Sequence, residues 1–271
     1  MKQIATLFSI LIESQSSTIT THNLTRSGVG LGVRMPHTDG QMIDFVLDAR
    51  SSVEPFTLSG NDGHGVFSIG PFTRYANRVH AIMLSPPSDI YPHHRLIESL
   101  GDPTPYCFGG TIGMAEMSRP RIGSSRLEFG VDFTASVSLV FSQEGRGPLP
   151  TRISSPQEQY NLDLLADDDS VPHEIMEVLL SEMERLGVTR TDLATIALLP
   201  SLEYTIYRSG SSSDVVVRIV LEPRDYFHPV FGEMIRPRLT RGQPRIGLNT
   251  LKHIGVFIDY RNRQIGFCEP I

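Results

Sequence analysis

The sequence is a succession of short apolar runs separated by glycine, proline and serine, and this pattern limits the fold more than any other feature. The 271 residues include 23 glycines and 19 prolines, which favour frequent turns. Only residues 172–186 have the pattern of a long amphipathic helix, with an apolar face of Ile175, Val178, Leu179 and Leu186. The sequence therefore predicts a mainly β fold, long enough for one large domain or two lobes.

Two of the early apolar runs predict a β-hairpin. Residues 28–35 and 42–47 have the pattern of strands, and the turn between them contains Pro36 and Asp39-Gly40. The glycines of GVGLG in the first strand do not complete the G-x-G-x-x-G pattern, and no helix follows them. A nucleotide-binding loop is therefore not predicted.

The rest of the chain predicts further strands with few helices. Residues 79–85 predict an apolar strand, and residues 93–101 predict a short helix that ends at Gly101. Residues 126–141 predict two strands flanking an aspartate and small residues, and the polar stretch 143–169 predicts a solvated surface loop. The later apolar runs predict strands at residues 202–207, 215–221 and 255–267, the last of these as a hairpin.

The N-terminal segment has features of a secretory signal. Lys2 precedes an apolar stretch at residues 4–12, which is too short to span a membrane. A signal peptide at residues 1–16 is one interpretation, and a first strand of the fold is the other. The triplet Asn23-Leu24-Thr25 is an N-glycosylation sequon, which favours the secretory pathway, with an extracellular, vacuolar or lysosomal destination. No later segment has the pattern of a membrane-spanning helix.

Charge and cysteine content exclude some classes of function. The net charge is −6 and the sequence pI is about 5.8, and because there is no basic stripe, no nucleic-acid partner is predicted. Cys107 and Cys268 form one disulfide or remain two buried thiols, and the sequence does not choose between these states. The adjacent His93-His94 would point to opposite faces of a strand. We therefore expect no metal site and no cofactor.

Two aspartates lie in similar sequence frames. VLDARSSV contains Asp48 and GVDFTASV contains Asp132, and each aspartate follows an apolar residue and precedes Ser-Val by the same spacing. An aspartate at the end of an apolar strand is costly to bury unless hydrogen bonds or a function hold it. The repeat indicates either two related lobes that meet at their aspartates or two unrelated turn residues.

The C-terminal sequence PRIGLNTLKHIGVFIDYRNRQIGFCEPI resembles the end of pepsin-like aspartic proteases. Ile246-Gly247 stands at the family's Leu-Gly, and the following Asn-x-Leu-Arg pattern is matched by Asn249, Leu251 and Lys252. Ile265-Gly266-Phe267 fits the last strand of the family. The upstream segments LPSLEYTIYRSG and VLEPRDYF are also similar to parts of its C-terminal lobe. The resemblance covers roughly residues 170–271.

Within this resemblance, FVLDARSS is similar to the family's first active-site segment, apolar-apolar-Asp-Thr-Gly-Ser-Ser. Asp48, Ser51 and Ser52 match that motif, whereas Ala49 and Arg50 replace its threonine and glycine. The segments VHAIMLS and PHHRLIESLG resemble the Gly-Leu-Gly strand and short helix that follow in the N-terminal lobe.

Asp132 is the candidate for the second aspartate of the family. Ser136 matches the motif, and Phe133-Thr134 replaces the Thr-Gly that follows the aspartate. Asp132 is much closer to Asp48 in the sequence than the two aspartates are in the family, and the family's flap tyrosine has no match.

The resemblance implies a pepsin-like bilobal acid-protease fold, mainly β, with a few short helices. It implies a reduced N-terminal lobe at residues 28–110 and a C-terminal lobe at residues 111–271. Asp48 and Asp132 would be catalytic, sharing one proton and one water between facing loops, as in an aspartic-type endopeptidase. A polypeptide would bind in the cleft between the lobes of a monomer, without a cofactor.

The motif departures favour a second interpretation, a catalytically inactive homologue that binds peptides or proteins. The family's glycine lets backbone amides approach the aspartate, whereas Arg50 adds a Cβ, a long side chain and a positive charge. Ala49 and Phe133 lack the hydroxyl that braces the two loops. An unrelated β-rich protein is the third interpretation.

Overall fold

The computed structural model describes ten stretches of the chain: residues 19–27, 30–36, 40–50, 56–58, 64–118, 130–142, 151–188, 193–210, 213–228 and 236–271. The candidate signal at residues 1–16 and the motif residues Ser51 and Ser52 lie outside these stretches. Within them, no helix is long and apolar enough to cross a membrane.

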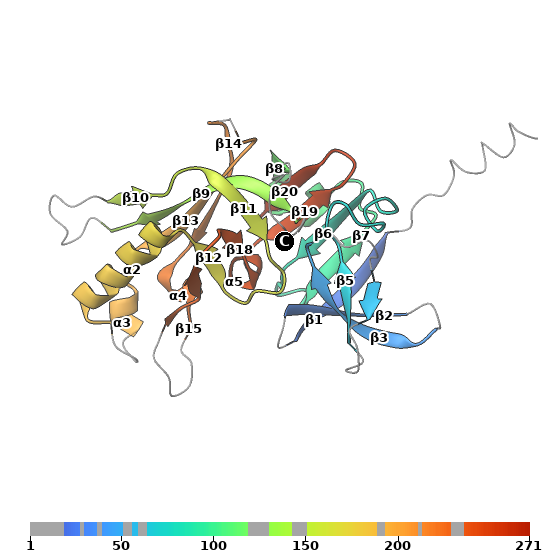
Figure 1. Ribbon diagram of the computed structural model, residues 1–271, viewed down its shortest axis with the longest axis horizontal. Coiled ribbons are helices and arrows are strands. Elements are labelled where there is room, and N and C mark those ends of the chain that lie inside the picture. The colour runs from blue at the N-terminus through green and yellow to red at the C-terminus, as the bar shows by residue number, and fades with distance from the viewer. Residues whose placement is uncertain are drawn as a thin grey trace, which may run out of the picture.

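Two large β-sheets lie side by side along the long axis of the molecule (Figure 1). The first has ten strands in the order β4-β5-β3-β2-β1-β7-β6-β19-β20-β8. Its strands are β1 (Thr20–Ser27), β2 (Gly30–Pro36), β3 (Met42–Asp48), β4 (Phe56–Leu58), β5 (His64–Ser68), β6 (Ala81–Ser85), β7 (His94–Glu98), β8 (Gly113–Glu116), β19 (Gly255–Asp259) and β20 (Gln264–Cys268). The two C-terminal strands thus join a sheet built mostly from the first half of the chain.

The second sheet has eight strands in the order β14-β13-β9-β11-β18-β12-β17, with β10 paired to β9. Its strands are β9 (Asp132–Val140), β10 (Arg152–Ser154), β11 (Glu158–Leu162), β12 (Asp169–Val171), β13 (Ser201–Tyr207), β14 (Val215–Leu221), β17 (Leu239–Arg241) and β18 (Arg245–Ile246). A small separate pair consists of β15 (Phe227–His228) and β16 (Arg236–Pro237). The predicted mainly β architecture is confirmed.

The helices are short apart from α2 (His173–Leu186), which covers the second sheet. The others are α3 (Leu193–Ile196), α4 (Pro223–Tyr226), α5 (Leu248–Leu251) and the 3-10 turns η1 (Thr104–Tyr106) and η2 (Phe108–Gly110). The predicted apolar face of α2 is confirmed, because Ile175 and Leu179 are fully buried and Val178 packs partly buried against the core. Pro172 precedes the helix as its N-cap and makes no side-chain capping hydrogen bond, and Gly187 ends the helix in a left-handed conformation (φ 62°).

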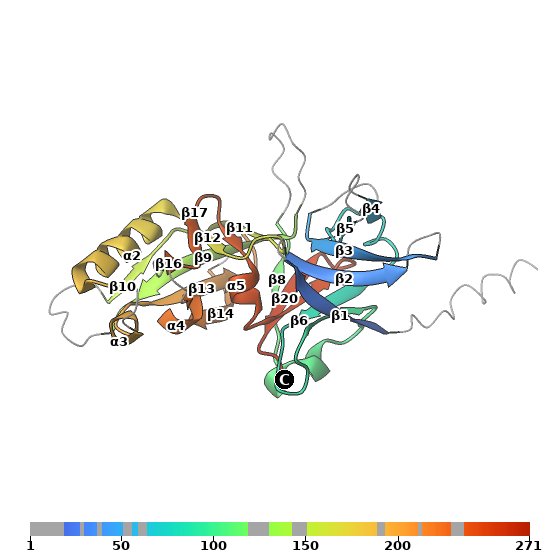
Figure 2. The same cartoon turned by 90° about the horizontal axis from the view of Figure 1, so that it is seen from below.

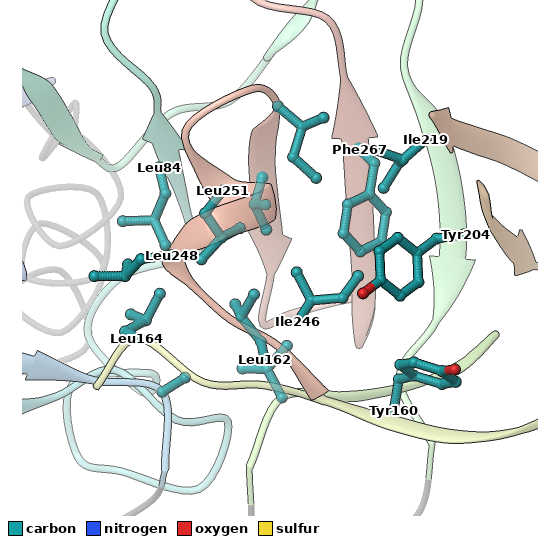
Figure 3. Packing of buried hydrophobic residues seen from close by; sticks show 14 of the residues in the cluster. Leu84, Tyr160, Leu162, Leu164, Tyr204, Ile219, Ile246, Leu248, Leu251 and Phe267 are labelled. Carbon is teal, nitrogen blue, oxygen red and sulfur yellow. The ribbon is translucent and has the colours of Figure 1, made fainter. Parts of the chain in front are cut away.

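One apolar core connects the two sheets (Figure 3). Leu84 of β6 and Phe267 of β20 belong to the same buried cluster as Tyr204 of β13 and Leu248 of α5. Leu164, which follows β11, is fully buried in this core near Leu248. The two lobes are therefore packed together through side chains that lie close to the candidate site.

The helix predicted at residues 93–101 is wrong, because this segment forms β7. Leu96 packs into the large core, whereas Ile97 packs into a second cluster on the opposite face of the sheet. Both faces of the strand are covered, so its apolar residues are consecutive and imitate a short helical pattern. The strand predicted at residues 79–85 is confirmed as β6, and the hairpin of β2 and β3 is confirmed by its antiparallel register.

The solvated loop predicted at residues 143–169 is also wrong over its described part. Residues 152–154 and 158–162 form β10 and β11, and Tyr160 and Leu162 are completely buried. The acidic residues of the segment suggested solvent, but the segment contributes residues to three strands of the second sheet, β10, β11 and β12. Of the two strands predicted at residues 126–141, the first lies largely outside the described residues, and the second is β9, which begins at Asp132.

Cys107 and Cys268 form a disulfide, one of the two states that the sequence left open. Both cysteines belong to the second apolar cluster, together with Met83, Ile97 and Phe257 on the face of the ten-stranded sheet that the 3-10 turns cover (Figure 2). The bond connects positions 161 residues apart and ties the C-terminal strand β20 to the chain that leaves β7.

Candidate functional site

Asp48 is the last residue of β3, inside the ten-stranded sheet. β3 pairs in parallel with β5, where Asp48 lies opposite Ser68, and the Asp48 carbonyl accepts a hydrogen bond from the Ile69 amide at 2.8 Å. The residue is only 8% exposed. The parallel partner fixes the end of β3, so the carboxylate emerges at a rigid position where the chain turns.

Arg50 contacts both oxygens of the Asp48 carboxylate. Its backbone amide donates to Oδ1 at 2.9 Å, which closes a tight turn around the aspartate. Its side-chain Nε lies 3.0 Å from each carboxylate oxygen, and Nη2 lies 2.9 Å from Oδ2. This bidentate arrangement is the strong form of an arginine–carboxylate pair. The Asp48 carboxylate is therefore neutralised by a residue of its own turn.

The second sheet repeats this arrangement at Asp163. This residue directly follows β11, which pairs in parallel with β18. The Asp163 amide donates to the Ile246 carbonyl at 2.9 Å, and the Leu165 amide donates to Asp163 Oδ1 at 3.0 Å. In both turns, the backbone amide two residues after the aspartate donates to the aspartate Oδ1, from Leu165 to Asp163 and from Arg50 to Asp48. Asp163 is therefore the structural counterpart of Asp48.

Asp132 occupies a different environment. It is the first residue of β9, opposite Asn161 of β11, and its Oδ1 accepts a hydrogen bond from Asn161 Nδ2 at 2.8 Å. The prediction that Asp132 ends a strand is wrong, because Asp132 is the first of the nine residues of β9. That its carboxylate shares a water with Asp48 stays a prediction.

The sequence contains a signal for Asp163 in the segment around Ile246-Gly247. Ile246-Gly247 was matched to the apolar-Gly segment of pepsin-like proteases, and the structure pairs Ile246 with Leu162, the residue before Asp163. The aspartate also precedes the α2 helix, as part of the acidic run that was assigned to a solvated loop. Asp132 shares its sequence frame with Asp48, whereas Asp163 shares its turn geometry.

Gly30 brings the two aspartate turns close together. β2 pairs with β3 in antiparallel register, and Gly32 lies opposite Val46. Two residues toward the start of β2 is Gly30, and two residues toward the end of β3 is Asp48. A Cβ at Gly30 would lie 2.6 Å from the Leu164 carbonyl oxygen, and the φ of +134° also favours glycine. The turn after Asp163 therefore lies against the strand end that neighbours Asp48.

The acidic residues after β11 each have a basic partner or are buried. Asp163 Oδ2 lies 3.4 Å from Arg245 Nη1, and Asp168 Oδ1 lies 3.4 Å from Arg238 Nη1. Asp167 pairs with Arg26 of β1 at 2.9 Å, across the two sheets. Asp48 and its counterpart Asp163 are thus each ion-paired with an arginine.

Asp169 is a fully buried carboxylate beneath the Asp163 turn. It accepts hydrogen bonds from the Gly247 amide at 2.7 Å, Asn249 Nδ2 at 3.2 Å and Thr250 Oγ1 at 2.8 Å. Burial raises its pKa to about 6, although these donors act in the opposite direction. Asp169 thus fixes the backbone between β18 and α5. In the same segment, the Ile246 carbonyl accepts a hydrogen bond from the Asp163 amide.

The bracing residues of pepsin-like sites are absent from both turns. Ala49 and Leu164 follow the aspartates, and both are fully buried apolar side chains without a hydroxyl. Arg50 and Leu165 stand at the positions of the two glycines. Among the described residues, no group of histidine, cysteine and acidic side chains is arranged to hold a metal ion.

Comparison with solved structures identifies a similar fold. The crystal structure of an aspartic proteinase from Irpex lacteus superposes with a TM-score of 0.64 and 12% sequence identity, over 93% of this chain and 98% of the proteinase. No protein-family model matches the sequence. No curated protein matches it either. At this identity the likeness concerns the fold alone, and the chain therefore has a pepsin-like fold of two β lobes.

Proposed function

We propose that this protein is a catalytically inactive, pepsin-like polypeptide-binding protein. The observation that carries the proposal is the bidentate contact of Arg50 with Asp48. In peptide hydrolysis by two aspartates, one carboxylate takes a proton from water while the other, protonated, donates one to the peptide carbonyl. Arg50 occupies both oxygens that would perform the first step.

The second aspartate supports the same conclusion. A working pair shares one proton because two close like charges are not both ionised. Here each carboxylate has its own guanidinium, Arg50 for Asp48 and Arg245 for Asp163, so the charge of each is balanced without a shared proton. The replacement of both motif glycines also crowds the backbone that would approach the carboxylates.

The retained frame supports binding of an extended polypeptide between the lobes. The two strand–aspartate turns keep matching backbone geometry, and Gly30 keeps them in contact. Mutation of a catalytic motif removes chemistry without removing the surfaces on which a substrate lies. We propose a monomer that enters the secretory pathway, which the buried Cys107–Cys268 disulfide supports because such bonds persist in oxidising compartments.

The second candidate function is an acid endopeptidase. One observation favours it: the i+2 amide contacts its carboxylate at 2.9 Å in the Asp48 turn and at 3.0 Å in the Asp163 turn, a symmetry typical of paired catalytic loops. In this case Asp48 and Asp163 would activate water once Arg50 moved away.

One experiment separates the two functions. The full chain is incubated at acid pH with an unfolded model polypeptide, oxidised insulin B chain, and both binding and cleavage are measured. The proposal predicts saturable binding without cleavage, and competition by a statine-type transition-state mimic. Cleavage that the mimic inhibits would establish the peptidase, whereas neither binding nor cleavage would contradict both functions.

A further inference from the structure

We propose that Asn23 carries an N-linked glycan on the outer face of the ten-stranded sheet. The triplet Asn23-Leu24-Thr25 has the acceptor sequence for this modification. A sequon alone is common, so the proposal depends on whether the folded chain leaves the acceptor side chain outside and unoccupied. The structure meets these conditions in three ways.

The first condition is the direction of the side chains. Leu24 is 2% exposed and packs into the apolar core, and Asn23 and Thr25, its neighbours in β1, are both exposed. Alternate residues of a strand point to opposite faces, so the two sequon side chains lie together on the solvent face. Leu24 fixes this orientation, because exchanging the faces would expose its side chain.

The second condition is that the acceptor is not used within the protein. In the part of the chain that the structure describes, the side chains of Asn23 and Thr25 form no hydrogen bond or ion pair with a described partner. A glycan attached at Asn23 Nδ2 therefore displaces no described interaction, and the fold loses no stabilising contact.

The third condition is space beside the strand. Residues Thr20–Leu24 pair with β7, whereas β2 pairs only with Thr25–Ser27 among the described residues. The stretch that contains Asn23 thus has a described strand on one side only. The residue opposite Thr25 on β2 is Gly32, which has no side chain to crowd the first sugar. On the other side, Arg95 of β7 lies opposite Asn23, and its guanidinium stacks on the ring of Tyr91.

The modification is a group transfer with a defined donor. The amide nitrogen Nδ2 of Asn23 forms a bond to the anomeric carbon of an oligosaccharide carried on a lipid pyrophosphate. The bond between that carbon and the pyrophosphate oxygen breaks, the lipid pyrophosphate leaves with the electron pair, and one amide proton passes to a base. This chemistry takes place in the secretory pathway, where the Cys107–Cys268 disulfide also forms.

The test uses the full chain with its own N-terminal segment, produced in a eukaryotic cell line. We expect the protein to migrate faster after treatment with peptide N-glycosidase, which leaves Asp at position 23 in the tryptic peptide. Asn23→Gln and Thr25→Ala should abolish this shift, whereas Thr25→Ser should retain it because serine also completes the sequon.

Asn77→Gln is the matched control, since Asn77 is exposed but precedes Arg78-Val79 and forms no sequon. This variant should keep the shift. Recovery of position 23 as unmodified asparagine from the parent protein would overturn the proposal, including the case in which the chain never enters the secretory pathway. A shift that survives Asn23→Gln would overturn it as well.

Discussion

Arg50 Nε lies 3.0 Å from both oxygens of the Asp48 carboxylate, and Nη2 of the same guanidinium lies 2.9 Å from Oδ2. The two residues belong to one turn, so the contact needs no rearrangement elsewhere in the fold. The carboxylate of Asp48, which the sequence predicts to be catalytic, is therefore ion-paired with a residue of its own turn. The same turn at Asp163 has Leu165 in place of Arg50 and receives its cation from Arg245 of the adjacent strand.

We first predict which aspartate is the partner of Asp48. A restored variant carries Ala49→Thr and Arg50→Gly in one turn, Leu165→Gly in the other and Arg245→Gln beside it, which removes the side chains that crowd the carboxylates and both guanidinium partners. We expect it to cleave an unfolded polypeptide at acid pH above the parent's background. Adding Asp163→Asn should abolish this gain, whereas adding Asp132→Asn should preserve it, because the Asp132 carboxylate is bound to Asn161.

Circular dichroism and thermal unfolding would verify that these variants fold. Loss of the gained cleavage with Asp132→Asn, together with its retention in Asp163→Asn, would show that Asp132 is the partner and that the assignment to Asp163 is wrong.

The second prediction concerns the packing of α2. Leu179 is fully buried against the second sheet, and Leu179→Ala should lower the free energy of unfolding by about 2–5 kcal/mol. Leu198→Ala is the matched control, because Leu198 is 63% exposed and its truncation should change stability by less than about 0.5 kcal/mol. Urea unfolding measures both values. Equal effects at the two positions would contradict the described packing.

A third prediction follows from burial of Asp169. Its folded pKa of about 6 is above the ordinary 3.8, so between these values the folded state binds the proton more tightly than the unfolded chain. The contribution of Asp169 to stability is therefore largest in acid and is lost as the pH rises through 6. Among the described residues, the ionisable groups that interact with this carboxylate are the buried Tyr160 and Tyr204 and the half-buried Lys252.

The measurement is the unfolding free energy of the parent and of Asp169→Asn between pH 4 and pH 7, the window that these two pKa values define. The unfolding free energy of the parent minus that of Asp169→Asn should increase as the pH falls. Other titrating groups, such as His94 with its lowered pKa, contribute equally to both proteins and cancel in this difference. Asp167→Asn is the control, since the Asp167 side chain is 43% exposed whereas Asp169 is fully buried. A difference that is constant with pH would show that Asp169 does not titrate in this range.

A fourth prediction tests the disulfide. Because it closes a loop across 161 positions, Cys268→Ser should lower the free energy of unfolding by about 2–5 kcal/mol. Guanidinium unfolding of the oxidised parent and the variant gives this difference. Unchanged stability after the substitution, or two titratable thiols in the unreduced protein, would be incompatible with the bond.

Much of the fold was predictable from local patterns, and the errors have physical causes. The β2–β3 hairpin, the strand β6 and the apolar face of α2 followed from turn residues and periodicity. β7 was mistaken for a helix because both of its faces are buried, which removes the alternation that identifies a strand.

The candidate site was predictable in one lobe only. Asp48 is the last residue of a strand whose preceding residues are largely apolar, so neighbouring residues in the sequence are enough to predict its position. Asp163 depends on the parallel pairing of β11 with β18, between segments more than eighty residues apart, and no local pattern reveals that pairing. The contact of Arg50 with Asp48 was anticipated only as a nearby positive charge, because the rotamer of an arginine is decided by its surroundings.

The central claim is that the ion pair with Arg50 keeps Asp48 from acting as a catalyst. The most direct measurement is cleavage of oxidised insulin B chain at acid pH by the parent protein and by Asp48→Asn, each with and without a statine-type inhibitor. We predict that the parent cleaves no faster than Asp48→Asn and that the inhibitor changes neither rate. Cleavage by the parent that both the inhibitor and Asp48→Asn abolish would contradict the claim and establish an active aspartic endopeptidase.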